Sequence, residues 1–126
     1  MGMYSDVICN VCGWRFAINV GGGFEFYDLH CEVCGRHKRV EIEEIKDARL
    51  AFAKHQGWFP LYWKGELIDS YPGEPLTGEE YDRAVEDFAG VCECGGFFRH
   101  LAPVRCPKCR STDLRQDPEG RSFLYD

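Results

Sequence analysis

The stretch "VCECGGFFRHLAPVRCPKC" (91–109) contains two cysteine pairs separated by 11 residues. An earlier stretch, "ICNVCGWRFAINVGGGFEFYDLHCEVCG" (8–35), contains two more pairs, separated by 18 residues. Three pairs have the spacing C-x-x-C and one has C-x-C. The pairs contain all eight cysteines of the chain: Cys9, Cys12, Cys31, Cys34, Cys92, Cys94, Cys106 and Cys109.

The cellular compartment decides how such cysteines are interpreted. The start, "MGMYSDVICN", has no basic segment followed by an apolar run, so we expect no secretory signal. No apolar run approaches the ~18 residues of a membrane span. We therefore expect a cytoplasmic protein, in which thiols stay reduced and paired cysteines favour metal binding. A disulfide framework is the alternative, and its connectivity could not be deduced from the spacing.

Two thiolates this close in sequence can chelate one ion when a tight turn folds the backbone over the metal. The turn needs a residue that tolerates positive φ after its second cysteine, and Gly13, Gly35 and Gly95 occupy that position. Two such turns, or knuckles, complete a tetrahedral four-sulfur site, for which zinc is the usual occupant. We therefore predict two zinc ions per chain, with all eight cysteines as ligands.

We expect the four pairs to combine in sequence order, because each site would then enclose its own hairpin. A crossed grouping, in which the first pair meets the third, is the alternative, but consecutive elements are usually neighbours in space. The favoured grouping gives one site with Cys9, Cys12, Cys31 and Cys34, and a second site with Cys92, Cys94, Cys106 and Cys109.

The residues between the first two pairs have the pattern of a hairpin. Large apolar and smaller or polar residues alternate over 14–20, which indicates a strand. Three glycines, 21–23, interrupt this pattern before it resumes over 24–30, as in a β-hairpin. A third strand is expected within 37–45. The C-terminal unit repeats the layout in a shorter form, ending with a strand around Leu114.

Both units resemble the zinc-ribbon/rubredoxin-like superfamily, and "RCPKCR" (105–110) resembles the second knuckle of a rubredoxin. The whole chain resembles small uncharacterised bacterial proteins with two zinc ribbons around a helical middle. This resemblance implies a metal-binding protein of unassigned role. Two positions depart from the pattern. The pair Cys92-Glu93-Cys94 lacks one spacer residue, and Arg110 replaces the glycine that usually follows the last knuckle cysteine.

The middle of the chain reads as two helices around an aromatic stretch. Residues 45–56 have the apolar spacing of a helix that ends at Gly57. Thr77 and Glu80 form a capping box that begins a second helix, with Gly90 as its stop. We expect the segment between them, "WFPLYWKGELIDSYPGEPL" (58–76), to pack as core or between the ribbons. Stacking of its rings on bases is the alternative.

The expected fold is therefore a small, metal-stabilised α+β protein. Two zinc ribbons, each a short antiparallel β-hairpin with cysteine knuckles, are joined by a helical, aromatic-rich middle segment. The expected divisions are an N-terminal ribbon over 1–45, the middle segment over 46–90 and a C-terminal ribbon over 91–126.

Eight cysteines fill two four-coordinate sites and leave no position open for water or substrate, which favours structural metal. The chain has no P-loop, GxGxxG or nucleophile-elbow motif, so we expect a non-enzymatic protein that binds another protein. Rubredoxin-like electron transfer by iron is the alternative, because four thiolates suit either metal. A dithiol oxidoreductase at Cys106 and Cys109 is disfavoured, because no βαβ pattern surrounds them.

The charge balance bears on nucleic-acid binding. The net charge is −6 with neutral cysteines, and each four-thiolate site around a divalent cation adds about −2. Such an anion is poorly suited to phosphate contacts. Only 91–126 has more basic than acidic residues, so nucleic-acid binding there is a further alternative, through Arg99, Arg105, Lys108 and Arg110. His30 and His37 adjoin the second pair, and we expect them to face solvent rather than replace a cysteine.

Overall fold

The computed structural model describes residues 2–22 and 25–125. Across these residues the strands form a seven-stranded antiparallel sheet and a separate two-stranded hairpin, accompanied by two α-helices and a short 3₁₀ helix. In chain order the elements are β1 (Gly2–Cys9), β2 (Arg15–Gly22), β3 (Phe26–Cys31), β4 (His37–Glu41), η1 (Ile42–Ile45), α1 (Lys46–Gln56), β5 (Leu61–Trp63), β6 (Glu66–Ile68), α2 (Gly78–Ala89), β7 (Phe98–Arg99), β8 (Leu114–Gln116) and β9 (Ser122–Tyr125).

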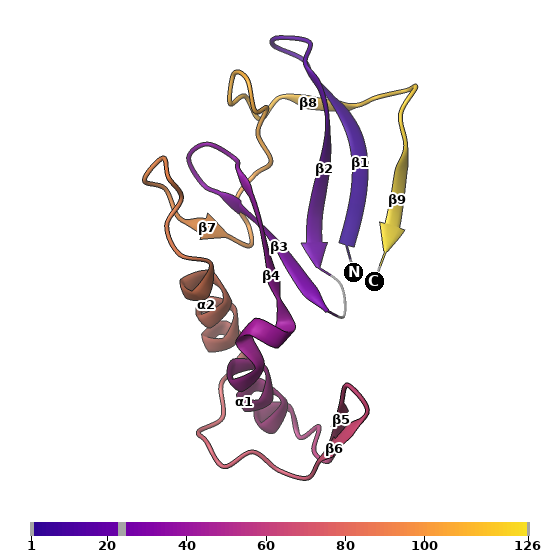
Figure 1. Cartoon of the computed structure of the whole chain (residues 1–126). Helices are drawn as coiled ribbons and strands as arrows, with labels where there is room; N and C mark the ends of the chain where they lie inside the picture. Colours follow the sequence, from indigo (N-terminus) through magenta and orange to yellow (C-terminus); the bar gives the residue numbers. More distant parts are fainter. Residues whose placement is uncertain (1, 23–24, 126) are drawn as a thin grey trace.

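Two hairpins carry the N-terminal part of the sheet. β1 pairs with β2 along almost its whole length, and β3 pairs with β4 in the same way. In contrast, among the described residues β2 and β3 pair only at Gly21↔Asp28 and Gly22↔Tyr27. The two hairpins therefore diverge towards their turns, as Figure 1 shows. The strands predicted within 14–20, 24–30 and 37–45 are present, although the last ends at Glu41 and continues as η1. Gly23 and Phe24 lie outside the described residues.

The C-terminal strands complete this sheet. β7 pairs with β3, while β8 and β9 both pair with β1. The strand expected around Leu114 is confirmed as β8, but the expectation that it belongs to a separate C-terminal hairpin is wrong. The pairing Gly2↔Tyr125 brings the first and last described residues side by side, near the N and C marks in Figure 1.

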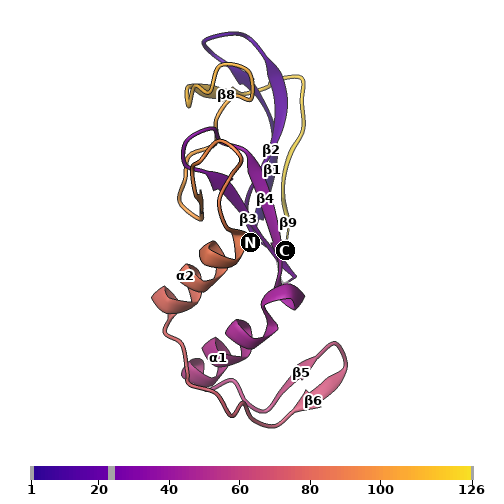
Figure 2. The same ribbon diagram turned by 60° about the vertical axis from the view of Figure 1, so that its left-hand side comes forward.

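The main apolar core lies between the β3–β4 hairpin and the helices. Leu29, Val40 and Val85 are fully buried there, and Tyr81 of α2 packs with them. Both predicted helices are confirmed. In α2 the hydroxyl of Thr77 accepts a hydrogen bond from the N–H of Glu80, as the capping box requires. Figure 2 shows the two helices next to each other at one end of the molecule.

The aromatic stretch after α1 differs from expectation. It forms the β5–β6 hairpin, which lies at the opposite end of the molecule from the β1–β2 turn (Figure 1). Tyr62 is 74% exposed, and Trp58 and Leu67 are about half exposed. The prediction that this segment is core or inter-ribbon packing is therefore wrong for these three side chains. None of the described helices is both long and apolar enough to cross a membrane.

Candidate metal centres

Two of the four knuckles are the turns of the N-terminal hairpins. The first cysteine of each pair ends a strand, Cys9 in β1 and Cys31 in β3. The second lies in the turn that leads into β2 or β4. The third knuckle joins α2 to β7, and the fourth lies in the loop between β7 and β8. Regular strands and a capped helix therefore fix where the first three thiol pairs begin.

All four knuckles have the same backbone hydrogen bonds. In each, the N–H of the residue after the second cysteine donates to the carbonyl of the first, over 2.8–3.0 Å. In each, the first cysteine also donates its own N–H to a carbonyl beyond the turn. The C-x-C knuckle makes both bonds although it is one residue shorter. The four residues that follow the second cysteines all have positive φ: Gly13, Gly35, Gly95 and Arg110.

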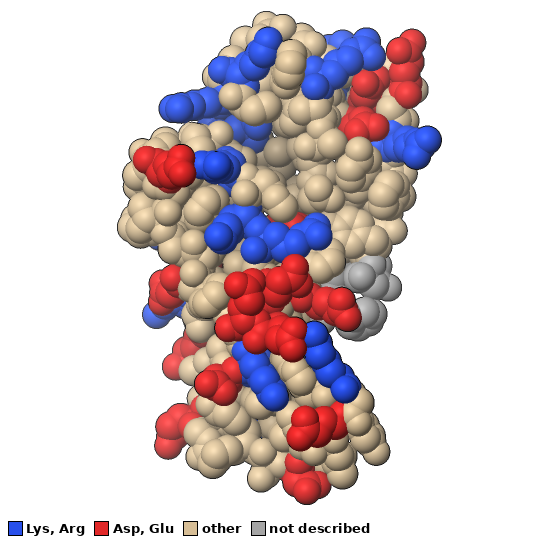
Figure 3. Space-filling view, viewed as in Figure 1, with Lys and Arg blue, Asp and Glu red and all other residues tan. Residues whose placement is uncertain are grey.

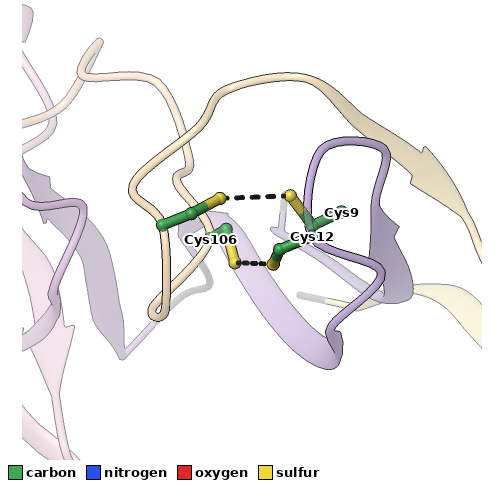
Figure 4. Close-up of side chains that lie close together, drawn as sticks. Cys9, Cys12 and Cys106 are labelled. Carbon is green, nitrogen blue, oxygen red and sulfur yellow. Dashed lines mark hydrogen bonds between the residues drawn. The ribbon is translucent and has the colours of Figure 1, made fainter.

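The structure groups the eight cysteines into two nested clusters. The outer cluster is formed by the first and fourth pairs, and the inner cluster by the second and third pairs. Within each cluster the four sulfurs lie within 4.8 Å of one another. Figure 4 shows Cys9 and Cys12 facing the loop that carries Cys106. The outer cluster contains Cys9, Cys12, Cys106 and Cys109, and the inner cluster contains Cys31, Cys34, Cys92 and Cys94.

The predicted grouping by sequence order is therefore wrong, and so is the crossed alternative. The prediction assumed that residues 14–30 form one hairpin between the first two pairs. In the structure, β2 turns back on β1 and β3 on β4, so these two knuckles are turns of different, diverging hairpins. The sheet brings the C-terminal loops to them instead, because β7 pairs with β3 and β8 with β1.

The sulfur positions fit a tetrahedral metal ion. Across each cluster, the closest sulfurs from the two knuckles are separated by 3.4–3.6 Å. A disulfide would require about 2.0 Å. Bonds of about 2.3 Å from zinc to four tetrahedral sulfurs place the sulfurs about 3.8 Å apart. The clusters are thus close to the size of a four-thiolate metal site, and each has two buried cysteines.

At least one thiol in each cluster has a lowered pKa and ionises easily. The N–H of Cys12 points at the sulfur of Cys9 and, with other backbone donors, lowers the pKa of Cys9 to about 7. Burial raises the pKa of Cys31, but the N–H groups of Cys34 and Val33 outweigh it and bring the pKa to about 6. The folded backbone therefore stabilises a thiolate in both clusters.

In each cluster, at least one other thiol resists ionisation when no cation is present. Burial and the neighbouring thiols raise the pKa of Cys34 to about 11. For Cys109 the N–H of Ser111 lowers the pKa, but burial and the other thiols of the outer cluster outweigh it and raise it to about 12. Four negative charges cannot share so small a volume at neutral pH, so each cluster requires a cation to become fully ionised.

The histidines are not in either cluster of described ligand atoms. His30 is buried, 4% exposed, so the expectation that it faces solvent is wrong. Burial lowers the pKa of His30. His37 is exposed, as expected, and its Nε2 lies 2.6 Å from a carboxylate oxygen of Asp28. Both residues therefore belong to the surroundings of the inner cluster.

Sequence reasoning missed Asp28, which fixes the strands that carry the inner cluster. Its buried carboxylate accepts hydrogen bonds from Arg39 of β4 and from Tyr125 of β9, in addition to the contact with His37. Strand alternation could have indicated its position. Side chains alternate between the two faces of a strand, so in β3 Phe26, Asp28 and His30 share the face opposite to the core residue Leu29.

The basic residues of the C-terminal segment are dispersed. Arg99 pairs with Glu32 and Glu86, with nitrogen–oxygen distances of 3.5 and 3.7 Å. The Nζ of Lys108 lies 3.9 Å from the ring centroid of Trp14 and so joins the first and fourth knuckles. Arg105 and Arg110 line a cavity instead.

Comparison with known proteins gives one family. No curated protein and no solved structure matches the chain. The family described as "Domain of unknown function (DUF8255)" matches residues 5–115, a range that includes all eight cysteines. Because this match covers most of the 126 residues, the chain belongs to that family of unknown function.

Proposed function

We propose that this is a non-enzymatic, cytoplasmic zinc protein, in which two structural four-cysteine sites join the C-terminal segment to the N-terminal hairpins. The observation that carries the proposal is the composition of the clusters. Each has four thiols at the spacing of a tetrahedral site, from two knuckles with the same backbone bonds. Four protein ligands fill the coordination of zinc and leave no position for a substrate, which favours a structural role.

Metal content tests this proposal directly. The full chain, purified without added metal, is expected to contain two zinc ions. Removal of zinc by a chelator is expected to abolish amide protection in β1, β3, β7 and β8, because both clusters hold these strands together. A metal-free chain with unchanged protection would contradict the proposal. The variant Cys106→Ser, which alters the outer cluster alone, should reduce the content to one zinc ion while the inner site stays filled.

Iron at one or both sites is the second candidate, supported by the same four-sulfur geometry. It would make the protein a rubredoxin-like electron carrier. Natively loaded protein would then absorb strongly in the visible range through charge transfer from thiolate to iron. A colourless protein with two zinc ions excludes this candidate.

We further propose that the protein acts as a protein-interaction module. The support is a cleft of about 580 Å³ between α1 and the β5–β6 hairpin. Its lining includes the aromatic residues Trp58, Tyr62 and Trp63, together with the acidic residues Glu25 and Glu43. Partly exposed aromatic side chains are typical anchors at protein interfaces. The cleft lies away from both clusters, so binding there would leave the metal sites unchanged.

The interaction can be tested by isolating the intact protein with its partners from cells. The variant Tyr62→Ala should lose a partner that the wild type retains, while its zinc content stays at two. Leu101→Ala is a matched control, because Leu101 is 96% exposed and lies outside the cleft. A partner that both variants retain would not use the cleft. Nucleic acid has less support as a partner, because Arg99 and Lys108 are already engaged.

A further inference from the structure

A second cavity, of about 500 Å³, lies where the two N-terminal hairpins diverge. Residues 16–19 of β2 form one wall, and the second knuckle forms the opposite wall with Gly35 and Arg36. The fourth knuckle closes it with Arg105 and Arg110. The cavity therefore exists only because the C-terminal loop folds over the gap between β2 and β3, and it lies between the two clusters.

The cavity is lined by positive charge. Three arginines, Arg36, Arg105 and Arg110, are among the residues that line it. No carboxylate lines it among the residues that the structure describes. Figure 3 shows Lys and Arg side chains over the knuckle loops and the upper part of β3–β4, above a band of Asp and Glu near the start of α1. An anion that enters the cavity thus lies near three arginines in a protein that is acidic overall.

One hydrogen bond holds the Arg105 side chain in place, and its Nε–H has no hydrogen-bond partner. Its NH1 donates to the backbone carbonyl of Arg110 at 3.1 Å, which fixes the guanidinium plane. Its Nε is buried and has no hydrogen-bond partner, a state that it shares only with His100 Nε2 among the described side chains. A buried N–H without an acceptor costs free energy, and an acceptor supplied by a ligand would remove that cost.

Arg110 is placed at the cost of backbone strain. Its φ is +63°, in the left-handed region where the other three knuckles have glycine. Such strain in a residue other than glycine often accompanies a binding role.

The arginines could simply balance the charge of the two metal sites. Charge balance acts at a distance, so it would leave the buried Nε of Arg105 without an acceptor. Guanidinium groups match the geometry and charge of phosphate oxygens. We therefore propose that the cavity binds the phosphate group of a small anionic ligand. The site goes beyond the proposed structural role of the metals and needs them only to hold the fourth knuckle in place.

The test uses the full, metal-loaded chain labelled with ¹⁵N and titrated with inorganic phosphate. We expect saturable shifts of the Arg105 Nε–H signal and of the Gly35 and Arg110 amides. Sodium chloride at the same ionic strength should not produce them. Arg105→Gln should weaken binding about tenfold or more, since it removes a charge-assisted donor. Arg83→Gln, on the exposed face of α2, should have no effect.

A second variant keeps the proposal testable if Arg105→Gln fails to fold. Glu93 is 88% exposed and lies 3.1 Å from NH1 of Arg36. Glu93→Gln releases that guanidinium, so phosphate should bind about two- to threefold more tightly. Shifts that do not saturate, or an affinity unchanged in both variants, would overturn the proposal. The proposal would also be overturned if a short single-stranded oligonucleotide shifts these NMR signals and inorganic phosphate does not. Zinc content, measured in every sample, separates loss of the cavity from loss of metal.

Discussion

Arg110 shows how one residue departs from a pattern that the rest of the molecule keeps. At the equivalent position the other knuckles have Gly13, Gly35 and Gly95, with φ between +77° and +94°. Arg110 takes the same conformation and makes the same hydrogen bond to the first cysteine of its knuckle. For a residue with a Cβ atom, the left-handed conformation costs about 1–2 kcal/mol.

Replacing Arg110 with glycine should therefore stabilise the metal-loaded protein. The greater freedom of glycine in the unfolded chain offsets part of the gain, which leaves about 0.5–1 kcal/mol. The reverse change, Gly13→Arg, should destabilise by a similar amount, since a Cβ atom at Gly13 meets no neighbour and only strain acts. Denaturant unfolding at fixed free zinc measures both. Equal midpoints for all three proteins would show that the knuckle tolerates any residue here.

Tyr125 gives a prediction about alkaline pH. Burial and the hydrogen bond to Asp28 raise the pKa of Tyr125 to about 12. Because the folded value lies above the unfolded value of about 10, Tyr125 stabilises the fold fully below pH ~10. This contribution is lost as the pH rises through about 12. Tyr125→Phe should lack that loss, so its stability should fall less than that of the wild type over this range.

The matching measurement is the absorbance of tyrosinate. One of the late-titrating groups of the wild type should be missing in Tyr125→Phe. Tyr62→Phe is the control, because Tyr62 is 74% exposed and its loss should leave the late groups in place. A wild-type titration in which Tyr125 ionises with the exposed tyrosines would contradict the assignment.

At the scale of elements, local signals predicted strands and helices well but not their partners. Alternation identified β2, β3 and β4, and the capping box identified α2, because these patterns depend on nearby residues. The pairing of β7 with β3 and of β8 with β1 depends on residues that are far apart in sequence. The candidate sites show the same difference between local and long-range information. The spacing of the cysteines and the turn residues beside them are local, and they identified all eight cysteines. The grouping of the cysteines into two clusters depends on how distant strands pair in the sheet. The aromatic stretch was misassigned because ring content alone does not distinguish core from an exposed hairpin.

The cap of α2 is expected to matter beyond the helix. α2 ends two residues before Val91 and packs Tyr81 and Val85 against β3 and β4, so it positions the third knuckle. Thr77→Ala removes the acceptor for the N–H of Glu80 and should destabilise the protein by about 1 kcal/mol. Thr77→Ser keeps a hydroxyl acceptor, so this variant should lose much less stability. Denaturant midpoints at fixed free zinc distinguish them, and equal losses would show that the cap contributes nothing.

At the scale of the whole molecule, the two ends differ in what holds them. The buried apolar core contains Leu29, Val40 and Val85 and includes two cysteines of the inner cluster, Cys31 and Cys92. No residue of the outer cluster belongs to this core within the described chain. The end of the molecule that carries β1 and β8 therefore depends more on its metal, and chelation should release it before the inner end.

Nesting also couples the two metal sites. The outer site joins Cys12 to Cys106, 94 residues apart. The inner site links Cys31 to Cys94 within that loop. Once it has formed, the loop that the outer site must close contains only the segments 12–31 and 94–106, about 31 residues in total. The entropic free-energy cost of closing the outer site is then about 1 kcal/mol lower. This corresponds to at least about fivefold tighter zinc binding at the outer site, and linkage requires the same factor in the other direction.

Two half-site variants test this coupling. Cys92→Ser with Cys94→Ser leaves only the outer site, and Cys106→Ser with Cys109→Ser leaves only the inner site. Each should bind its remaining zinc at least about fivefold more weakly than the wild type binds there, in competition with a chromophoric chelator at fixed pH. Two sites grouped in sequence order would close separate loops and show no such factor. Unchanged zinc affinity in both variants would therefore contradict the nested arrangement. Weaker zinc binding in both variants is expected because the first knuckle pairs with the fourth and the second with the third.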